Sequence, residues 1–324
     1  MIKNSPKTFD TSAPVLMGDN GPTAAGSSNT KEFLRCPKSW QYAYIRGLRV
    51  PQQQTPSHFA RGTVFGAIRA AWFGLKFDDS PKAWRVLKRA AQKAAEDEAL
   101  PVEEKDEAFA LAMFGKYIEF WKRRPRPRPI ATEFELGPCA LSPDTPKALY
   151  RTGKLDDLSY YPEAGGALCL GECKTTSGDI GTLIKEYELH IQPLQYLALY
   201  NADPRGAKKY GEVAGIVLDV TCKPNERRKV PSFHRVFVEI RKETVQQFAE
   251  SVAGYMNAMN KISWDSYVPR TYQCTYMAGR ARVDCAFKPL CRFGRAAAGG
   301  YVMKGGSSLM KHKPTPGEMK HPWE

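Results

Sequence analysis

The feature that most constrains the fold is a pair of strand-like segments, residues 151–161 and 167–176, separated by the sequence PEAGG. Apolar and aromatic residues recur through both segments, and proline followed by two glycines is a turn-forming sequence. The sequence therefore predicts a β-hairpin, and the neighbouring segments are expected to build a sheet around it.

The segments around the hairpin predict an α/β core of the restriction-endonuclease-like type, a mixed central sheet flanked by helices. Strand character and helical periodicity alternate along this part of the chain. The predicted strands are residues 131–137, 213–222 and 232–241, and the predicted helices are residues 185–201 and 242–262.

A helical lobe is predicted ahead of this core. Residues 63–121 are rich in Ala, Leu, Lys and Glu, with apolar residues at helical spacings. The run RRPRPRP at 123–129 ends the lobe, because successive prolines remove helix donors. A first helix is predicted after the capping sequence at 28–30, with a break at Pro37.

These patterns predict five parts in the chain. They are a flexible N-terminus (1–28), a helical lobe with a first cluster cysteine (29–130), the core (131–262), a cysteine-bearing segment (263–295) and a flexible tail (296–324).

The formal net charge is +14, from 48 Lys and Arg against 34 Asp and Glu, which favours a polyanionic partner. No run of about 18 apolar residues occurs, and no signal peptide is recognisable, so a cytoplasmic protein is expected. Thiols stay reduced in that compartment, which makes metal ligation a better hypothesis than disulfides for the eight cysteines.

The hairpin carries a chemically informative trio, Asp156 on one arm and Glu172 and Lys174 on the other. Glu172 and Lys174 share a face because side chains alternate along a strand. Two carboxylates and an ammonium suit phosphodiester hydrolysis, since carboxylates hold Mg²⁺ or Mn²⁺ and the metal polarises the phosphate and activates water. A solvated face with incidental ion pairs is the alternative, but the apolar run ALCLG before Glu172 argues against it.

In the motifs GKLD (153–156), ECK (172–174) and QPLQY (192–196), the chain resembles the PD-(D/E)XK nucleases. Within this family it resembles the RecB-like branch, which includes AddB and the CRISPR-associated RecB-like exonucleases. The resemblance implies that Asp156, Glu172 and the backbone carbonyl of Cys173 hold Mg²⁺ or Mn²⁺. It also implies that Lys174 assists the attacking water, while Gln192 and Tyr196, on one helix face, position the phosphate.

The resemblance further implies an exonuclease that acts on DNA, single-stranded or at duplex ends, in a bacterial or phage-infected cell. Recombination, repair or phage and mobile-element DNA processing are the expected settings. A helicase, a recombinase or a single-strand-binding protein is the expected protein partner, and no membrane is involved.

One departure concerns the histidine that the branch places in a GTxxH element. The matching stretch here is GTVFG, with Gly66 at the histidine position. His58, Glu133 and Glu135 are alternative donors. If none of them completes the site, the alternative function is a catalytically weak DNA-binding accessory protein.

Four cysteines, one near the start of the chain and three near its end, suit an iron–sulfur cluster or zinc, and their spacing alone does not choose between them. They are Cys36, Cys274, Cys285 and Cys291. Their arrangement is similar to that of the [4Fe-4S] cluster of AddB and its relatives. The zinc alternative would accompany an RNA-processing role. The remaining cysteines, Cys139, Cys169, Cys173 and Cys222, are predicted to be buried thiols.

Basic residues gather at 122–128, at 223–229 and around the cysteine tail, where they would bind phosphates without sequence preference. Trp40, Tyr42 and Tyr44 are expected to belong to the core, with stacking on single-stranded bases as the alternative.

Overall fold

The structure is a computed structural model of the 324-residue chain. It describes residues 27–40, 42–43, 48–49, 57–96, 102–141, 151–187, 190–225, 229–259, 275–278, 281–293 and 302–303. The chain divides into two compact units. Unit 1 contains residues 1–51, 137–153 and 249–324, and unit 2 contains residues 52–136 and 154–248.

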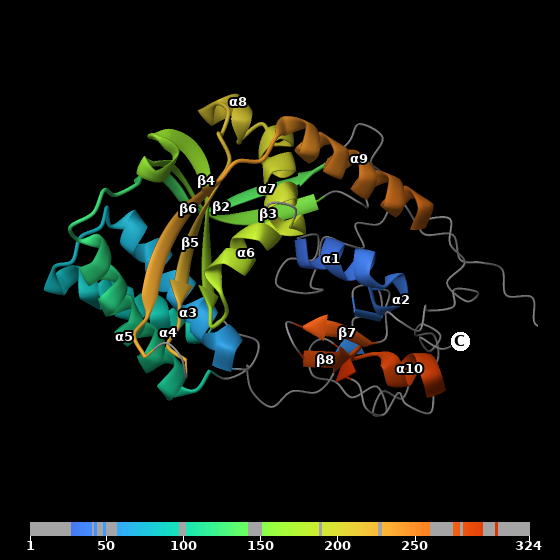
Figure 1. Cartoon of the computed structure of the whole chain (residues 1–324), viewed down its shortest axis with the longest axis horizontal. Helices are drawn as coiled ribbons and strands as arrows, with labels where there is room; N and C mark the ends of the chain where they lie inside the picture. The colour runs from blue at the N-terminus through green and yellow to red at the C-terminus, as the bar shows by residue number, and fades with distance from the viewer. Residues whose placement is uncertain are drawn as a thin grey trace, which may run out of the picture. The chain divides into compact units, whose positions relative to one another are not determined.

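Unit 2 is built on a five-stranded mixed sheet with the order β2-β3-β4-β5-β6 (Figure 1). β3 and β4 are antiparallel, β4 and β5 are parallel, and β5 and β6 are antiparallel. The α/β fold class predicted from the sequence is thereby confirmed. The strands are β2 (Arg128–Cys139), β3 (Arg151–Tyr161), β4 (Ala167–Thr176), β5 (Ile216–Cys222) and β6 (Ser232–Val238).

The predicted hairpin is present as β3 and β4, with Asp157 opposite Gly171 and Tyr161 opposite Ala167. A short 3-10 turn, η3 (Pro162–Ala164), joins the two strands. Gly165 and Gly166 follow it with φ of 65° and 82°, a left-handed backbone that glycine adopts without a side-chain clash. The PEAGG sequence therefore closes the hairpin for the reason that its composition indicates.

Within this five-stranded sheet, β5 is the most buried strand, since all seven of its residues are buried. Its sequence, IVLDVTC, is a nearly continuous apolar run, as expected of a strand covered on both faces. The helices that flank the sheet are α3 (Ser57–Gly74), α4 (Pro81–Glu96), α5 (Glu104–Trp121), α6 (Ile180–Tyr187) and α7 (Ile191–Ala202).

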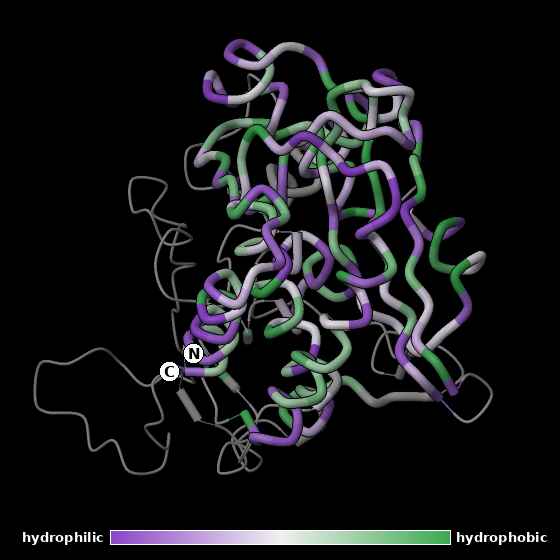
Figure 2. Tube along the Cα trace, turned by 90° about the vertical axis from the view of Figure 1, so that its left-hand side faces the viewer, coloured by the Kyte–Doolittle hydropathy of each residue, from purple (hydrophilic) through white to green (hydrophobic). Residues whose placement is uncertain are grey.

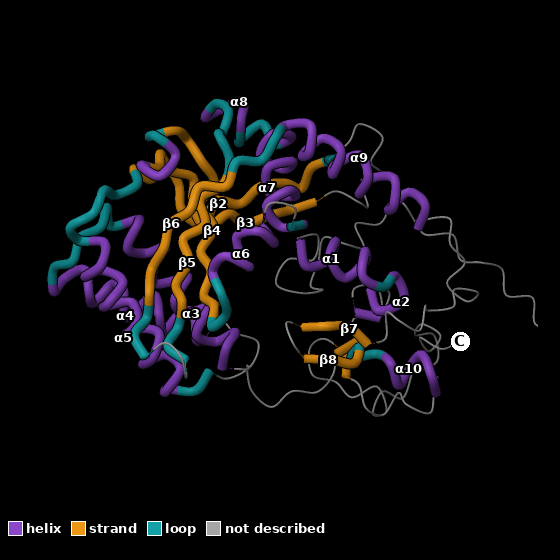
Figure 3. The backbone as a smooth tube through the Cα atoms, viewed as in Figure 1, coloured by secondary structure: helices purple, strands orange, loops and turns teal. Residues whose placement is uncertain are grey.

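Helices α3, α4 and α5 lie together on one side of the sheet, and α6 and α7 lie on the other (Figures 1 and 3). The first group forms an aromatic core, in which the ring of Trp72 lies 4.9 Å from that of Phe77 and 5.8 Å from those of Phe114 and Tyr117. Hydrophobic and hydrophilic residues alternate along the described trace, as Figure 2 shows. The helical character predicted for residues 63–121 is confirmed by these helices, which lie in the same compact unit as most of the sheet.

The single helix predicted at 185–201 is wrong in one respect, because the structure has two helices there. α6 ends at Tyr187 and α7 begins at Ile191, with His190 as its N-cap. Pro193 explains the break, since proline is tolerated in the first turn of a helix but not in its interior. The short helix α8 (Ala207–Tyr210) and the long helix α9 (Lys242–Met259) complete this part of the chain.

Unit 1 joins segments that are far apart in the sequence. Its described elements include α1 (Ser27–Arg35) and α2 (Pro37–Trp40), separated at Cys36 as the proline predicts. Trp40 Nε1 donates a 2.9 Å hydrogen bond to Asn29 Oδ1, which fixes α2 against α1. The other elements are the pair β1 (Leu48–Arg49) and β9 (Val302–Met303), the hairpin β7 (Thr275–Ala278) and β8 (Ala281–Asp284), and α10 (Lys288–Phe293).

Within the residues that the structure describes, no helix is both long enough and apolar enough to cross a membrane.

Candidate active site

The hairpin presents different chemistry on its two faces. Asp157 pairs with Gly171 across β3 and β4, so these two residues share the face toward α3. Asp156 and Glu172 are their sequence neighbours and therefore share the opposite face, toward α7. Asp156 Oδ2 accepts a 2.6 Å hydrogen bond from the backbone N–H of Cys173, which ties the two strands together beside the carboxylates.

Glu172 lies at the centre of the α7 face and is only 4% exposed. Its Oε1 accepts a 2.6 Å hydrogen bond from Gln192 Nε2 and forms an ion pair with Lys174. Lys174 Nζ in turn donates to Gln192 Oε1 at 3.0 Å, and Gln192 Nε2 lies 3.1 Å from the Tyr196 hydroxyl. The four side chains that the sequence singled out on β4 and α7 are thus in direct contact.

Two charged residues on the α7 face, Asp156 and Lys174, have pKa values shifted from their usual range. Burial and the nearby Glu172 carboxylate raise the pKa of Asp156 to about 7. Burial disfavours the charged form of Lys174, but the Glu172 carboxylate outweighs it, and the pKa of Lys174 is raised well above its usual value. Lys174 is therefore a fixed cation, whereas Asp156 gives up its proton only near neutrality.

The site offers two carboxylates to a hard divalent cation. Glu172 Oε2 is buried and has no hydrogen-bond partner among the described residues, and the Asp156 carboxylate is close enough for the two charges to repel each other. A cation between two such carboxylates relieves that repulsion and satisfies the remaining oxygen. Among the described residues, however, no group of three or more His, Cys, Asp or Glu side chains is arranged to hold a metal ion.

Gly66 stands where the resemblance to the RecB-like branch predicts a histidine ligand. It lies on α3, one turn after Gly62, where an added Cβ atom would lie 3.3 Å from Thr175 Oγ1 of β4. A Cβ atom at Gly66 would have no atom of the described residues within 4 Å, so the space beside this position is open. The side chain of His58 lies outside the described residues. The exposed Glu133 forms an ion pair with Lys154 and does not join the two carboxylates.

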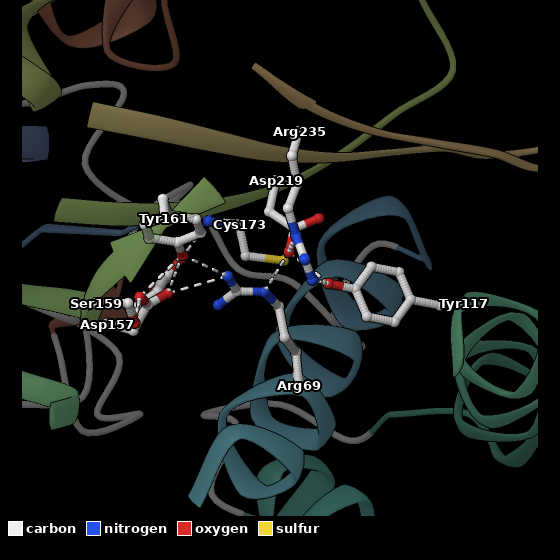
Figure 4. A network of polar contacts seen from close by, with 9 residues as sticks. Arg69, Tyr117, Asp157, Ser159, Tyr161, Cys173, Asp219 and Arg235 are labelled. Atoms are coloured by element: carbon white, nitrogen blue, oxygen red, sulfur yellow. Dashed lines mark hydrogen bonds and ion pairs between the residues drawn. The ribbon is translucent and has the colours of Figure 1, made fainter. Parts of the chain in front are cut away.

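The α3 face of the hairpin holds a buried network of charges that the sequence did not reveal (Figure 4). Arg69 bridges two strands, with Nη2 2.9 Å from Asp157 Oδ2 and Nε 2.9 Å from Asp219 Oδ2. All three side chains are at most 1% exposed. The other members are Tyr117, Ser159, Tyr161 and Arg235, which donate hydrogen bonds to these carboxylates or to each other.

This network fills the space beside Gly171. A Cβ atom at Gly171 would overlap the carboxylate of Asp157 and the hydroxyl of Tyr161. The glycine before Glu172 is therefore required by the buried network behind the site and not by its own backbone conformation.

Sequence reasoning missed two further residues next to the site, Tyr187 and His190. The Tyr187 hydroxyl donates a 3.3 Å hydrogen bond to Gln192 Oε1, and the His190 ring stacks on the Tyr187 ring with centroids 5.2 Å apart. His190 Nδ1 also accepts a hydrogen bond from the backbone N–H of Gln192 at 3.3 Å. The proline at position 193, which places a helix start near 190, was the signal that would have found them.

Two of the candidate cluster cysteines, Cys36 and Cys285, are buried in unit 1, and Cys285 contacts sequence neighbours of Cys36. Cys36 is 3% exposed and Cys285 is 5% exposed. The Cys285 thiol lies 3.6 Å from Ser39 Oγ and 4.0 Å from Arg35 Nη2, two residues that lie on either side of Cys36 in α1 and α2. Cys291 follows on α10, and Cys274 lies outside the described residues. No two cysteines of the described segments form a disulfide.

The aromatic and basic candidates have mixed outcomes. Trp40 and Tyr42 are core residues at 3% and 4% exposed, so base stacking by either is ruled out, and Tyr44 lies outside the described residues.

In the basic run at 122–128, Arg126 donates a hydrogen bond to the carbonyl of Phe77 at 3.2 Å. The exposed Arg128 lies over the ring of Tyr160, with its guanidinium carbon 4.3 Å from the centroid. Part of this run therefore packs within unit 2.

The family described as the PD-(D/E)XK nuclease superfamily matches residues 27–292, and the chain belongs to this superfamily. Its members are generally metal-dependent nucleases, typically with Mg²⁺ or Mn²⁺, and their substrate is DNA. No curated protein matches the sequence.

Proposed function

We propose that the protein is a metal-dependent DNA exonuclease of the RecB-like branch, with its active site on the α7 face of the hairpin. The observation that carries the proposal is the buried Glu172 carboxylate. One of its oxygens is bound by Lys174 and Gln192, and the other has no hydrogen-bond partner in the described part of the chain. The charge of Glu172 also helps to raise the pKa of Asp156. A carboxylate buried in this state is costly unless it serves a ligand.

Each residue of the site has its own role in the proposed cleavage reaction. Asp156, Glu172 and the backbone carbonyl of Cys173 would hold Mg²⁺ or Mn²⁺. When bound, the cation supplies Lewis-acid stabilisation of the negative charge that develops on the scissile phosphate. Lys174, kept protonated by Glu172, orients the attacking water or offsets that charge.

Gln192 and Tyr196 position the phosphate from α7. The Gln192 carboxamide is already fixed by Glu172 and Lys174, so it presents a defined donor and acceptor beside the reacting group. Burial followed by the Glu172 charge raises the pKa of Tyr196, so its hydroxyl stays protonated and can donate to a phosphate oxygen. The exposed arginines of the 122–128 run, Arg123, Arg124 and Arg128, would add contacts that depend on salt but not on sequence.

A cleavage assay on labelled DNA tests the proposal. Wild type, Lys174→Ala and the control Lys185→Ala, an exposed lysine of α6, are incubated with single-stranded and duplex DNA in Mg²⁺, Mn²⁺ or EDTA. Cleavage is expected for wild type and Lys185→Ala in either metal, and not for Lys174→Ala or in EDTA. Equal background rates for wild type and Lys174→Ala would show that the nuclease proposal is wrong.

The same assay separates exonuclease from endonuclease action. Substrates labelled at the 5′ or the 3′ end report the polarity of digestion, and circular single-stranded DNA has no end to attack. An exonuclease leaves the circle intact, whereas cutting of the circle at the rate of the linear strand would contradict the exonuclease assignment.

We further propose that Cys36, Cys274, Cys285 and Cys291 bind a [4Fe-4S] cluster that stabilises unit 1. The support is the position of the Cys285 thiol beside Arg35 and Ser39, which flank Cys36. Protein purified without oxygen is expected to be brown and to contain iron and sulfide. Cys285→Ser should lose both, whereas Cys139→Ser should keep them. A colourless protein that contains zinc would support the alternative of a zinc-stabilised factor.

The alternative function, a DNA-binding accessory protein with weak catalysis, is favoured by one observation, the open space beside Gly66 where the branch has a histidine ligand. It predicts DNA binding with no metal-dependent product. The five-part domain organisation, the cytoplasmic location and a partner that unwinds or coats DNA stay part of the proposal.

A further inference from the structure

Tyr187, the last residue of α6, contacts two of the proposed site residues at once. It is only 4% exposed, its hydroxyl donates to Gln192 Oε1 at 3.3 Å, and Lys174 Nζ lies 5.8 Å from the centroid of its ring. A buried tyrosine hydroxyl usually finds a hydrogen-bond partner. Here the hydroxyl points to a side chain of the site.

The Gln192 carboxamide depends on such neighbours for its orientation. Nε2 donates to Glu172 at 2.6 Å, and Oε1 accepts from Lys174 at 3.0 Å. A flipped carboxamide would place its oxygen against the carboxylate and its NH₂ group against the ammonium, which is unfavourable on both sides. The Tyr187 hydroxyl occupies the second lone pair of Oε1 and limits how far the carboxamide can tilt while keeping both contacts.

His190 holds Tyr187 in place. The two rings are nearly parallel, at 14°, with centroids 5.2 Å apart. The same imidazole accepts the backbone N–H of Gln192 at 3.3 Å and so caps the helix that carries Gln192. One histidine therefore fixes both the tyrosine and the backbone of the glutamine that the tyrosine contacts.

We propose that Tyr187 is a positioning residue of the cleavage reaction, which fixes the Gln192 carboxamide and, through it, the placement of Lys174 against Glu172. This inference rests on the proposed nuclease function. Tyr187 acts through Gln192 and has no contact with DNA in the proposal, so its loss lowers kcat and leaves the KM for DNA unchanged.

The variant Tyr187→Phe removes the hydroxyl and keeps the ring on His190 and Lys174. The expected result is a decrease in kcat of about three- to ten-fold, the factor that one hydrogen bond supplies. Tyr200→Phe is the matched control, because Tyr200 is a fully buried tyrosine on α7 whose hydroxyl donates to the carbonyl of Gly211 at 2.9 Å, away from the site. It should lower the melting temperature at least as much and leave kcat unchanged.

A double-mutant cycle separates positioning from a merely structural role. Because Tyr187 acts through Gln192, adding Tyr187→Phe to Gln192→Ala should lower kcat no further. If the second substitution lowers kcat by the same factor in both backgrounds, or if Tyr187→Phe alone has wild-type kcat, the inference is overturned.

A measurement without catalysis keeps the test independent of the proposed function. In protein labelled with ¹⁵N-glutamine, the side-chain NH₂ of Gln192 should exchange with solvent faster in Tyr187→Phe than in wild type or Tyr200→Phe. Equal exchange in all three proteins overturns the inference even if none of them cleaves DNA. Absence of cleavage by wild type, with faster exchange in Tyr187→Phe, contradicts only the nuclease proposal.

Discussion

Asp156 and Asp157 are adjacent on β3, but their carboxylates serve opposite faces of the sheet. Asp157 accepts a 2.9 Å hydrogen bond from the buried Arg69, whereas Asp156 faces Glu172 and has its pKa raised to about 7. Neutralising Asp156 is therefore expected to raise the stability of the folded protein, whereas neutralising Asp157 is expected to lower it.

Asp156→Asn should stabilise the protein in EDTA at pH 8. The carboxyl binds its proton up to about pH 7 in the folded chain but only up to about pH 4 when unfolded. The folded state thus holds more protons across this window, and wild-type stability falls as the pH rises through it. Denaturant unfolding should show the variant to be more stable above pH 7, with the difference shrinking toward pH 4. A variant that is less stable at pH 8 contradicts the assigned environment of Asp156.

Asp157→Asn should instead destabilise the protein by about 3 kcal/mol, the cost of leaving one member of a buried ion pair without its partner charge. Arg69 would retain only the Asp219 carboxylate. The same denaturant experiment measures this change, and Asp156→Asn is its matched control on the neighbouring residue. A loss below about 1 kcal/mol would show that the network tolerates an amide and that the charge of Asp157 is not needed.

Glu172→Gln should abolish metal-dependent stabilisation without unfolding the chain. A ligand at 100 times its Kd stabilises the folded state by about 2.7 kcal/mol, so the melting temperature of wild type should rise with Mg²⁺. The variant keeps a similar shape but loses the charge, and its melting temperature should not respond. Glu186→Gln, an exposed change on α6, should respond as wild type does. Equal responses of Glu172→Gln and wild type would place the metal elsewhere.

Gly66→His should strengthen Mn²⁺ binding, because the resemblance predicts a histidine ligand at this position, a Cβ there meets open space, and an imidazole suits a transition metal better than Mg²⁺. An increase in affinity of about ten-fold is expected, the scale that substitutions in the ligand environment produce. Gly66→Ala controls for the general gain in helix stability on replacing glycine. Equal Mn²⁺ affinities of the two variants, measured by calorimetry, would show that this position of α3 does not reach the carboxylates.

Gly171→Ala should destabilise the protein by about 1–3 kcal/mol, the usual cost of overpacking a closed interior. The added methyl group would overlap Asp157 and Tyr161, both of which are fully buried. Gly115→Ala, on α5, is the control, since a Cβ atom there would lie 3.8 Å from the ring of Trp84, an ordinary van der Waals distance. If the two variants unfold at the same denaturant concentration, the space beside Gly171 is wider than the packing indicates.

The hairpin and the faces on which its charged residues lie could be predicted because they depend on local patterns. Strand alternation places Glu172 and Lys174 on one face, and the helical spacing of Gln192 and Tyr196 places both on one side of α7. The structure brings all four together. The two same-face relations involve residues a few positions apart, and sequence reasoning is reliable at that scale. The contacts between β4 and α7 span 18 to 20 residues, and they are expected from the resemblance to the nuclease family and not from local patterns.

The Arg69 network could not be predicted, because its partners are 88 and 150 residues away in the sequence. Arg69 stands in the apolar run AIRAAWF (67–73), which indicates a buried arginine but does not identify its partners. The role of Tyr187 was missed for a different reason. A continuous helix at 185–201 would have turned this residue away from Gln192, and only the break before Ile191 brings the two side chains together.

The division of the chain also has a consequence for the order in which it folds during synthesis. Unit 2 ends at residue 248, whereas unit 1 needs both α1 and the segment 281–293, which includes Cys285 and Cys291. All residues of unit 2 therefore leave the ribosome before the residues 281–293, which unit 1 needs in addition to α1. Cys36 would be the thiol exposed longest in the nascent chain, and any cluster would be inserted only after the nuclease sheet has formed.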